Sequence, residues 1–318
     1  MRELPATPAV CLMAPTASGK TDLALALARR LPLGLVSVDS AMVYRHLNIG
    51  SGKPSPEVLA QYPHRLIDIR DPWERYSAGD FAGDAGAAIA GIAVDGRIPF
   101  LVGGTFLYFR SLLEGLSPLP PANPGVRAGI DARANRDGWA SLHAELAVLD
   151  PVAAARIGVA DRQRIQRALE VCYLTGQPLS ALQARPRTPA SGRFLKIGLM
   201  PGNRAELGER ITRRFSRMLE CGFIGEVESL LGLPGMDGDR PALRAVGYRQ
   251  IAAFVRGECS RPEAEARALA ATRQLARRQL TWLRRETCDL WLDVDSGDLV
   301  ADLEKAVRAA VPWMQYQA

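Results

Sequence analysis

The 318-residue chain carries 40 Lys and Arg residues against 34 Asp and Glu residues, and 47% of its residues are hydrophobic. This composition is that of an ordinary soluble protein with a sizeable core, long enough for one large domain and a smaller inserted or appended one. No stretch approaches the roughly 20 apolar residues that cross a bilayer, and the first residues show no signal-peptide pattern. We therefore expect a cytoplasmic protein that makes no membrane contact.

The cysteines and histidines are few and widely scattered. There are five cysteines and three histidines, and they form neither a CxxC pair nor an HxxxH spacing: Cys11, Cys172, Cys221, Cys259, Cys288, His46, His64 and His143. Metal sites and disulfide frameworks need clustered ligands. The pattern therefore indicates isolated thiols in a reducing compartment.

Short apolar runs alternate with helical patterns along the chain. A helix is predicted over Asp22–Leu31, where leucines recur every four residues on one face. Several apolar runs hold too few polar residues to face water, as is typical of buried parallel strands. The alternation predicts an α/β fold with a parallel sheet flanked by helices on both sides. The predicted strands are Val10–Met13, Leu35–Val38, Leu66–Ile69, Pro99–Val102, Leu195–Met200 and Leu290–Val294.

The alternation stops after Leu116, where four prolines occur in the nine residues SPLPPANPG. The pattern from about Val126 to Leu182 is helical, and a second loop over Ala184–Arg193 precedes the next predicted strand. We therefore expect an all-helical insertion domain over 118–193. The catalytic core would then comprise 1–117 and 194–318, with a basic helical part near its end.

Positive charge is concentrated late in the chain. Ten arginines and three glutamates lie between Arg244 and Arg285, a net charge of +7, whereas the whole chain sums to only +6. A charge so localised usually marks an anionic partner, and nucleic acid is the commonest large one. A solvated helix face is the alternative, but the excess is arginine and not a Lys/Glu mixture, which favours nucleic acid.

A phosphate-loop motif follows the first predicted strand and opens the first predicted helix. It fits GxxxxGK[ST] except at its first position, where alanine replaces glycine: Ala14, Pro15, Thr16, Ala17, Ser18, Gly19, Lys20 and Thr21. Amide groups at such a helix N-terminus converge on phosphate oxygens, the lysine reaches across them, and the threonine hydroxyl holds Mg²⁺. The loop does not name its ligand, because ATP, GTP and an allylic diphosphate present the same diphosphate oxygens.

Two further segments lie at the ends of predicted strands, where ligands of open parallel sheets bind. Asp39 follows the second strand and suits an outer-sphere Mg²⁺ ligand, a general base or a helix N-cap. Gly103-Gly104-Thr105 follows the fourth strand. This segment makes a tight turn with a capping threonine, and its glycines would also let a substrate approach the backbone with Thr105 facing it.

These motifs together resemble the bacterial tRNA dimethylallyltransferases, also called tRNA isopentenyltransferases, over nearly the whole chain. The phosphate loop departs from that family's GPTASGKT only at Ala14, and Ser51-Gly52 stands where Thr-Ala is commoner. The blocks that carry the resemblance are APTASGKT, VDSAMVYRHLNIGSGKP, HRLIDIRDPWERYSAGDF, LVGGTFLYFRSLLEGLSPLP, ADRQRIQRALEV, RAVGYRQ and ATRQLARRQLTWLR.

The resemblance implies an α/β fold with a P-loop NTPase-like parallel sheet flanked by helices and an all-helical insertion domain. It also implies transfer of a dimethylallyl group from dimethylallyl diphosphate to the N6 amine of the adenosine immediately 3′ of the anticodon, with Mg²⁺ as cofactor. Asp39 would be the general base, Thr105 would also face the reacting groups, and Thr21 would hold the metal. We expect a monomer that binds the anticodon stem-loop of tRNA. The implied tRNA contacts are Asp39, Ser40, Ala41, Met42, Thr105, Arg127, Gln163, Arg164, Ile165, Gln166, Arg167, Arg244, Ala245, Val246, Gly247, Tyr248, Arg249, Arg277, Arg278, Gln279, Leu280, Thr281, Trp282, Leu283 and Arg284.

Three other functions share some of these features. A small-molecule P-loop kinase would explain the loop and the sheet, but neither the basic segment nor the helical insertion. A prenyltransferase acting on free AMP would need no surface for RNA. A non-catalytic RNA-binding module would leave Asp39 and the phosphate loop without a role.

Overall fold

The computed structural model describes residues 8–187, 192–236, 238 and 240–311 and divides the chain into two compact units. One unit comprises Met1–Leu113 with Ala190–Ala318, and the other comprises Glu114–Pro189. Each boundary lies four residues before the one expected from the sequence. Of the loop expected over Ala184–Arg193, residues 188–191 lie outside the described part of the chain.

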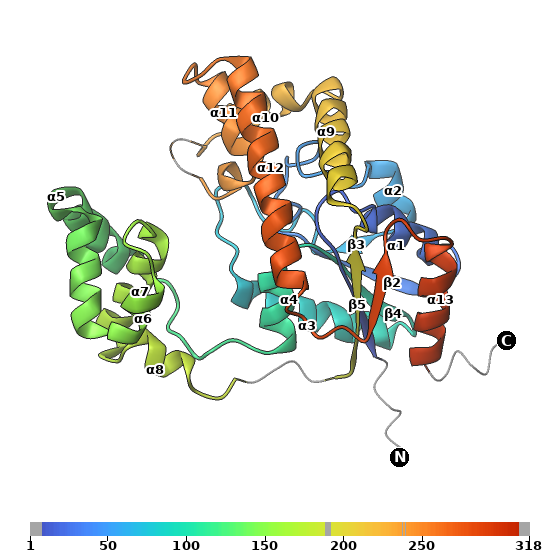
Figure 1. The fold of residues 1–318 in the computed structure, drawn as a ribbon, viewed down its shortest axis with the longest axis horizontal. Coiled ribbons are helices and arrows are strands. Elements are labelled where there is room, and N and C mark those ends of the chain that lie inside the picture. Colours follow the sequence, from blue (N-terminus) through green and yellow to red (C-terminus); the bar gives the residue numbers. More distant parts are fainter. Residues whose placement is uncertain (1–7, 188–191, 237, 239, 312–318) are drawn as a thin grey trace. The chain divides into compact units, whose positions relative to one another are not determined.

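The larger unit is built on a six-stranded sheet in the order β3-β2-β4-β1-β5-β6, and all its pairings are parallel (Figure 1). Every residue of the three central strands β2, β4 and β1 is buried, which confirms the prediction from their apolar sequences. The strands are β1 (Ala9–Met13), β2 (Leu33–Val38), β3 (His64–Arg65), β4 (Ile98–Gly103), β5 (Phe194–Met200) and β6 (Leu290–Asp293).

Helices cover both faces of this sheet. Successive strand residues point to opposite faces, so Val10 joins one apolar core and Cys11 the other. The first core is closed by helices α1 (Lys20–Ala28) and α13 (Leu299–Ala310). The second is closed by α3 (Ala78–Val94) and α4 (Phe106–Leu113), with Leu283 added from the end of α12 (Arg261–Leu283).

The third predicted strand is wrong in its position. The structure has only the two-residue β3 at the sheet edge, and the segment predicted as Leu66–Ile69 turns directly after it. Leu66 and Asp68 have φ of +66° and +56°, which no extended strand allows. The buried Lys53 side chain holds this turn by donating to Asp68 Oδ1 at 2.6 Å. Its apolar residues contribute to packing, not to the sheet.

A helical layer follows β5 in the same unit and has an apolar core of its own. This core joins α10, α11 and α12 to the loop after β2 through buried side chains such as Val43, Phe223 and Tyr248. The elements of the layer are α9 (Arg204–Glu220), α10 (Phe223–Leu231), the 3-10 turn η1 (Ala242–Arg244), α11 (Tyr248–Val255) and α12 (Arg261–Leu283). The short helix α2 (Pro56–Gln61) lies between β2 and β3 in the chain.

The regular structure among the described residues of the smaller unit is all helical, as the sequence predicts. It consists of α5 (Pro124–Leu149), α6 (Pro151–Arg156), α7 (Arg162–Thr175) and α8 (Leu179–Gln183), and α5 is interrupted at Gly138. Buried leucine, isoleucine and alanine side chains from all four helices form its core. In neither unit is any described helix long and apolar enough to cross a membrane.

Candidate active site

The phosphate loop joins the buried strand β1 to the N-terminus of α1, as its motif predicts. Two of its residues adopt left-handed backbone conformations, Ala17 with φ of +61° and Gly19 with φ of +78°. Ala14 is fully buried and keeps a negative φ, so alanine fits the position where the motif usually has glycine. The Ala14 amide donates to the Gly103 carbonyl at 3.1 Å, which ties the loop to the end of β4.

Lys20 lies at the start of α1 with its ammonium group turned into the loop. Its Nζ donates to the Pro15 carbonyl oxygen at 3.2 Å. Burial lowers the pKa of Lys20 to about 8, and the nearby Asp39 carboxylate opposes that shift only in part. A poorly solvated cation at a helix N-terminus favours a bound anion, because the anion replaces the missing hydration.

A small pocket brings together the predicted general base Asp39 and two predicted phosphate-loop residues, whereas the other predicted catalytic residue, Thr105, does not line it. Lys20, Thr21 and Asp39 all line it, with His64 on its wall. The remaining lining residues are Ser37, Met42, Pro54, Val102 and Gly103. A carboxylate, a hydroxyl and an ammonium group therefore converge at the mouth of the phosphate loop.

Asp39 also organises the backbone that follows β2. Its Oδ1 accepts hydrogen bonds from the amides of Ala41 at 2.8 Å and Met42 at 3.4 Å. A turn and not a helix follows Asp39, so these bonds form a side-chain-to-backbone turn and not the helix N-cap that the sequence left open. They fix the orientation of the carboxyl group. A carboxylate held at one oxygen in this way lines the pocket in a defined geometry.

The Gly103-Gly104-Thr105 turn is shaped by the protein itself. A Cβ at Gly103 would lie 2.1 Å from the Val38 carbonyl oxygen, and one at Gly104 would lie 2.6 Å from Gln279 Nε2. Protein atoms therefore fill the space on the Cβ side of both glycines, while Gly103 also lines the pocket that contains Lys20 and Asp39. Thr105 Oγ1 accepts from the Ser40 amide at 3.1 Å, next to Asp39.

Arg214 of α9 was missed from the sequence and is the second cation at the loop. Its Nη1 donates to Thr16 Oγ1 at 3.3 Å and its Nη2 to the Ser51 carbonyl at 3.2 Å. Burial lowers its pKa, and Asp39 opposes this shift. Gly52 makes the approach possible, because a Cβ there would lie 2.0 Å from Arg214 Nη2. The one feature of the sequence that could have pointed to this contact is Ser51-Gly52, which stands where the family more commonly has Thr-Ala.

His64 was also not assigned to the site. One ring nitrogen, Nδ1, lies 2.7 Å from the Tyr62 carbonyl, while Nε2 is buried without a hydrogen-bond partner among the described residues. Burial lowers the pKa of His64, which favours the neutral ring. A lone histidine carries no spacing signal, so only the fold reveals its position beside Lys20 and Asp39.

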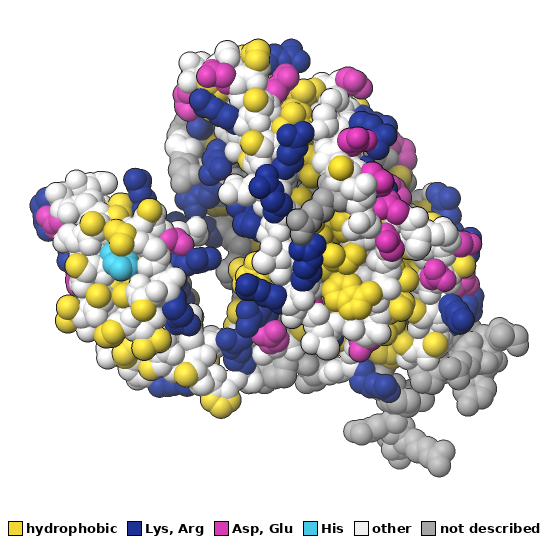
Figure 2. All heavy atoms as spheres, viewed as in Figure 1, with side chains coloured by type: hydrophobic (Ala, Val, Ile, Leu, Met, Phe, Trp, Pro, Cys, Tyr) yellow, Lys and Arg dark blue, Asp and Glu magenta, His cyan; other side chains and the backbone are white. Residues whose placement is uncertain are grey.

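The predicted RNA-binding arginines of α12 are exposed. Figure 2 shows Lys and Arg side chains gathered along this helix. Arg277, Arg278 and Arg284 form no ion pair with any acidic residue in the part of the chain that the structure describes. Exposed Trp282 packs beneath the Arg110 guanidinium, which lies 5.8 Å from the ring centroid. This surface can bind anions and aromatic bases.

Several predicted tRNA contacts are buried and cannot touch RNA through their side chains. Ile165, Tyr248 and Leu283 are fully buried, and Leu280 is nearly so. They lie on the inward sides of elements whose outward residues carry the charge, and a contiguous block of sequence includes both sides.

Tyr248 has a structural role within one of these predicted blocks. Its hydroxyl donates to Glu226 Oε1 at 2.6 Å and accepts from the Ser51 amide at 3.1 Å. Glu226 in turn accepts from the amides of Asn48, Ile49 and Gly50. This buried network anchors the loop that follows Asp39, so the block supports the site from behind.

Within the smaller unit, the predicted contacts Arg127 and Arg167 share a buried carboxylate. Both nitrogens of the Arg127 fork donate to Glu170 at 2.9 Å, and Arg167 donates to it at 2.6 Å. The Glu170 side chain is fully buried, whereas the two arginines are partly exposed. Two cations on one carboxylate leave a fixed positive cluster at the surface of this unit. Gln163 and Arg164 are exposed nearby on α7.

A parallel sheet whose first strand runs through a phosphate loop into a helix defines a P-loop α/β protein. Two family models match the chain, one described as IPP transferase over residues 42–286 and one as isopentenyl transferase over residues 8–70. The chain belongs to the IPP transferase family.

Relatives of known name agree with this assignment over most of the chain. A tRNA dimethylallyltransferase of Thioalkalivibrio sulfidiphilus is 56% identical over 278 residues, which are 87% of each protein. One of Stenotrophomonas maltophilia is 54% identical over 291 residues, 90% of this chain and 92% of that protein. The full-length tRNA isopentenylpyrophosphate transferase of Bacillus halodurans superposes with a TM-score of 0.69 at 33% identity, covering 98% of this chain and 99% of that one.

Proposed function

We propose that this chain is a tRNA dimethylallyltransferase. It transfers the dimethylallyl group of dimethylallyl diphosphate to the exocyclic N6 amine of the adenosine immediately 3′ of the anticodon and releases diphosphate. The observation that carries this proposal is the shared pocket of Lys20, Thr21 and Asp39, since it combines a diphosphate cradle with a carboxylate base. The family and its named relatives support the same reaction.

The reaction needs a base because an adenine amine is a poor nucleophile, with its lone pair delocalised into the ring. As the nitrogen attacks the allylic C1, the C1–O bond breaks and the diphosphate leaves with the electron pair. Asp39 accepts the proton lost by the nitrogen. The leaving diphosphate gains negative charge, and Lys20, Arg214 and the loop amides are aimed at that charge.

Mg²⁺ fits this pocket as a cofactor. Thr21 and Asp39 both line it, while no group of three or more His, Cys, Asp or Glu side chains forms a metal site among the described residues. Mg²⁺ commonly keeps several waters and takes only one or two protein oxygens beside substrate phosphates. The Thr21 hydroxyl would hold the ion at the diphosphate site, and Asp39 would remain available as the base. When bound, the ion neutralises charge on the leaving group.

The acceptor side of the proposal rests on the exposed arginines of α12 and the positive cluster around Glu170. Phosphate contacts from such residues position RNA without reading its sequence. The target base must leave its stack to reach the pocket, at a cost of a few kcal/mol that contacts elsewhere offset. A hairpin loop lowers this cost, which fits an adenosine in the anticodon loop.

Mass spectrometry of tRNA nucleosides tests the proposal. After incubation with dimethylallyl diphosphate, Mg²⁺ and unmodified tRNA, the adenosine 3′ of the anticodon should carry one dimethylallyl group. Free diphosphate should appear in equal amount, and Lys20→Ala should abolish both products. Product formation that needs ATP and releases ADP in equal amount would instead identify a kinase-type reaction and overturn the proposal.

A further inference from the structure

Gln279 lies within the predicted RNA-binding stretch of α12, yet its side chain turns away from the exposed arginines. Its Oε1 accepts from the Thr16 amide at 2.8 Å, and its Nε2 donates to the Gly104 carbonyl at 2.8 Å. One amide group therefore bridges the phosphate loop and the turn after β4. Gly104 is shaped around it, because a Cβ there would lie 2.6 Å from Nε2.

Thr16 is held by a second helix as well. Arg214 of α9 donates to Thr16 Oγ1 at 3.3 Å, so α12 holds the backbone of this residue and α9 its side chain. The next loop residue, Ala17, packs against an apolar cluster made by Leu207 and Ile211 of α9 with Ala276 and Leu280 of α12. The first half of the phosphate loop is thus fixed by the relative position of these two helices.

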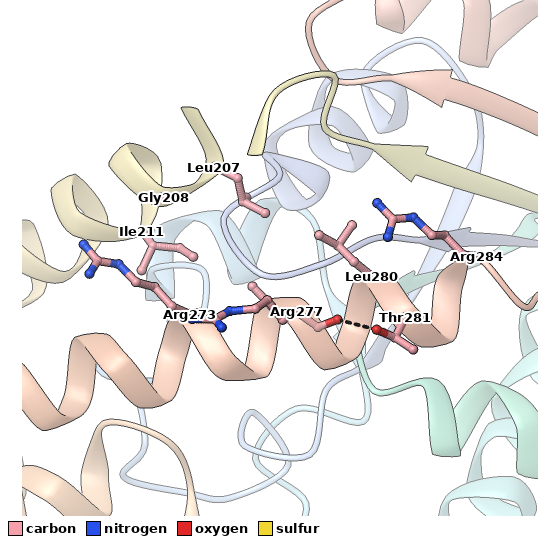
Figure 3. Close-up of a pocket in the computed structure, with 9 residues that line it drawn as sticks. Leu207, Gly208, Ile211, Arg273, Arg277, Leu280, Thr281 and Arg284 are labelled. Atoms are coloured by element: carbon pink, nitrogen blue, oxygen red, sulfur yellow. Dashed lines mark hydrogen bonds between the residues drawn. The ribbon is translucent and has the colours of Figure 1, made fainter. Parts of the chain in front are cut away.

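A solvent-open groove lined by arginines lies between the same two helices, α9 and α12. Arg273 and Arg277 of α12, together with Arg284 directly after it, line this groove opposite Leu207 and Ile211 of α9 (Figure 3). Thr281 faces the groove and donates to the Arg277 carbonyl at 3.0 Å. An anion held by these arginines therefore contacts the helix that carries Gln279. Binding of the anion therefore restrains α12, and α12 restrains the phosphate loop through Gln279.

We propose that Gln279 is a positioning residue that couples RNA binding on α12 to diphosphate binding at the phosphate loop. RNA in the groove fixes α12, and Gln279 transmits this restraint to Thr16. Because RNA has already ordered the loop, diphosphate binding loses less conformational entropy, and the affinity for diphosphate rises. By thermodynamic linkage, diphosphate raises the affinity for RNA by the same factor. This inference rests on the proposed function for the identity of the acceptor.

Calorimetric titration of inorganic diphosphate with Mg²⁺, with and without a saturating anticodon stem-loop RNA, measures this coupling. The wild-type protein should bind diphosphate at least about fivefold more tightly when RNA is present. Gln279→Met keeps the length of the side chain but removes both hydrogen bonds, and it should bring the ratio of the two affinities close to one. RNA affinity measured without diphosphate should stay within about threefold of wild type.

Gln274→Met is the matched control, because Gln274 lies exposed on the same helix and makes no contact with the loop. It should keep the wild-type ratio. Gln279→Glu retains the acceptor for Thr16 but cannot donate to Gly104, so an intermediate ratio is expected. A thermal melt establishes that each variant is folded.

The possible failures are distinguishable. If the wild-type protein binds RNA but its diphosphate affinity is unchanged or weaker with RNA, the coupling does not exist. If folded Gln279→Met keeps the wild-type ratio, coupling exists and Gln279 does not transmit it. If the wild-type protein binds no stem-loop RNA at all, the proposed function fails along with the inference.

Discussion

Asp39 combines a structural and a chemical task in one carboxyl group, and an amide can replace only the first. Asp39→Asn keeps the oxygen that accepts from Ala41 and Met42, so the loop after β2 should persist. It cannot accept a proton, and turnover should fall about 10²-fold or more. Single-turnover kinetics with saturating tRNA measures this, and tRNA affinity should change far less. Near-normal turnover would place the base elsewhere.

Lys20 predicts a pH dependence of donor binding. Its pKa in the free protein is about 8, so the ammonium form that attracts diphosphate dominates below this pH and is lost above it. kcat/KM for the donor should therefore fall as pH rises through about 8, whereas kcat should not, because bound diphosphate raises the pKa.

Lys20→Met separates this effect from titration of the donor itself. Since loss of Lys20 should abolish transfer, donor affinity of both proteins is measured by calorimetric titration as a function of pH. The variant should bind the donor more weakly, and its affinity should lack the part of the alkaline fall that comes from the lysine. An alkaline limb identical to that of the wild type would mean that another group titrates there.

At the scale of single residues, the sequence predicted the site residues that lie in a motif or at the end of a strand. The remaining site residues were found only in the structure. Lys20, Thr21 and Asp39 were predicted and line one pocket. Arg214 was not, because α9 offers several arginines and only its contacts with Thr16 and Ser51, far away in the chain, single it out. Tertiary contacts of this kind leave no periodic signal.

At the scale of a single element, the exposed arginines of α12 predict how RNA binding depends on salt. Each phosphate contact releases counterions, so log affinity for single-stranded or loop RNA should fall with log salt by about 0.7 per contact. Replacing Arg277 and Arg278 with alanine should flatten the slope by roughly 0.7 to 1.4. Filter binding between low and moderate salt measures the slope.

A variant in which Arg30 and Arg308 are replaced by alanine removes the same charge from the turn after α1 and from α13, where both arginines pair with Glu304. It should leave the slope unchanged. Equal flattening in the two variants would show that net charge alone, and not a surface on α12, governs RNA binding.

Glu170 makes the smaller unit depend on a buried charge. Although burial opposes its ionisation, hydrogen bonds from Arg127 and Arg167 hold the pKa of Glu170 below its usual value. Its stabilising contribution is present at neutral pH and is lost as pH falls through that lowered pKa. Glu170→Gln should therefore lower the free energy of unfolding by about 3–5 kcal/mol at neutral pH, since the arginines lose their counter-charge.

Urea denaturation of the wild-type protein and of Glu170→Gln measures the difference in their free energies of unfolding. Glu145→Gln, which breaks a partly exposed pair with Arg133 in the same unit, should cost less than about 1 kcal/mol. Equal losses in the two variants would contradict a special role for the buried carboxylate.

Elements were predictable where one physical signal was strong. The three central strands are buried on both faces, and their apolar runs identified them. The edge strand β3 has only two residues, His64 and Arg65, too few for any pattern, so the apolar turn after it was taken for the strand. Helix α1 begins at Lys20, two residues before the predicted start, because Gly19 turns the chain directly into it.

The division of the whole molecule could be approached from composition alone, because a proline-rich segment interrupts the alternation of strands and helices. The structure shifts each boundary by four residues, to Leu113 and Pro189. The reason is that prolines mark where regular structure stops, while a unit extends as far as its side chains pack. Glu114, on the smaller unit's side of the first boundary, pairs there with Arg187. Such contacts are invisible in a local pattern.

The choice of acceptor is a property of the whole molecule, because each unit carries its own exposed positive surface. A mononucleotide has too few phosphates to engage the arginines of α12, and none remain for the cluster of Arg127 and Arg167. A hairpin loop offers several phosphates and a base that loses less stacking than one in a duplex. We therefore expect efficient transfer to an isolated anticodon stem-loop, weak transfer to the same sequence in a duplex, and almost none to AMP. Comparing kcat/KM for the three acceptors decides the matter, and similar values for AMP and the stem-loop would leave both basic surfaces without a role in catalysis.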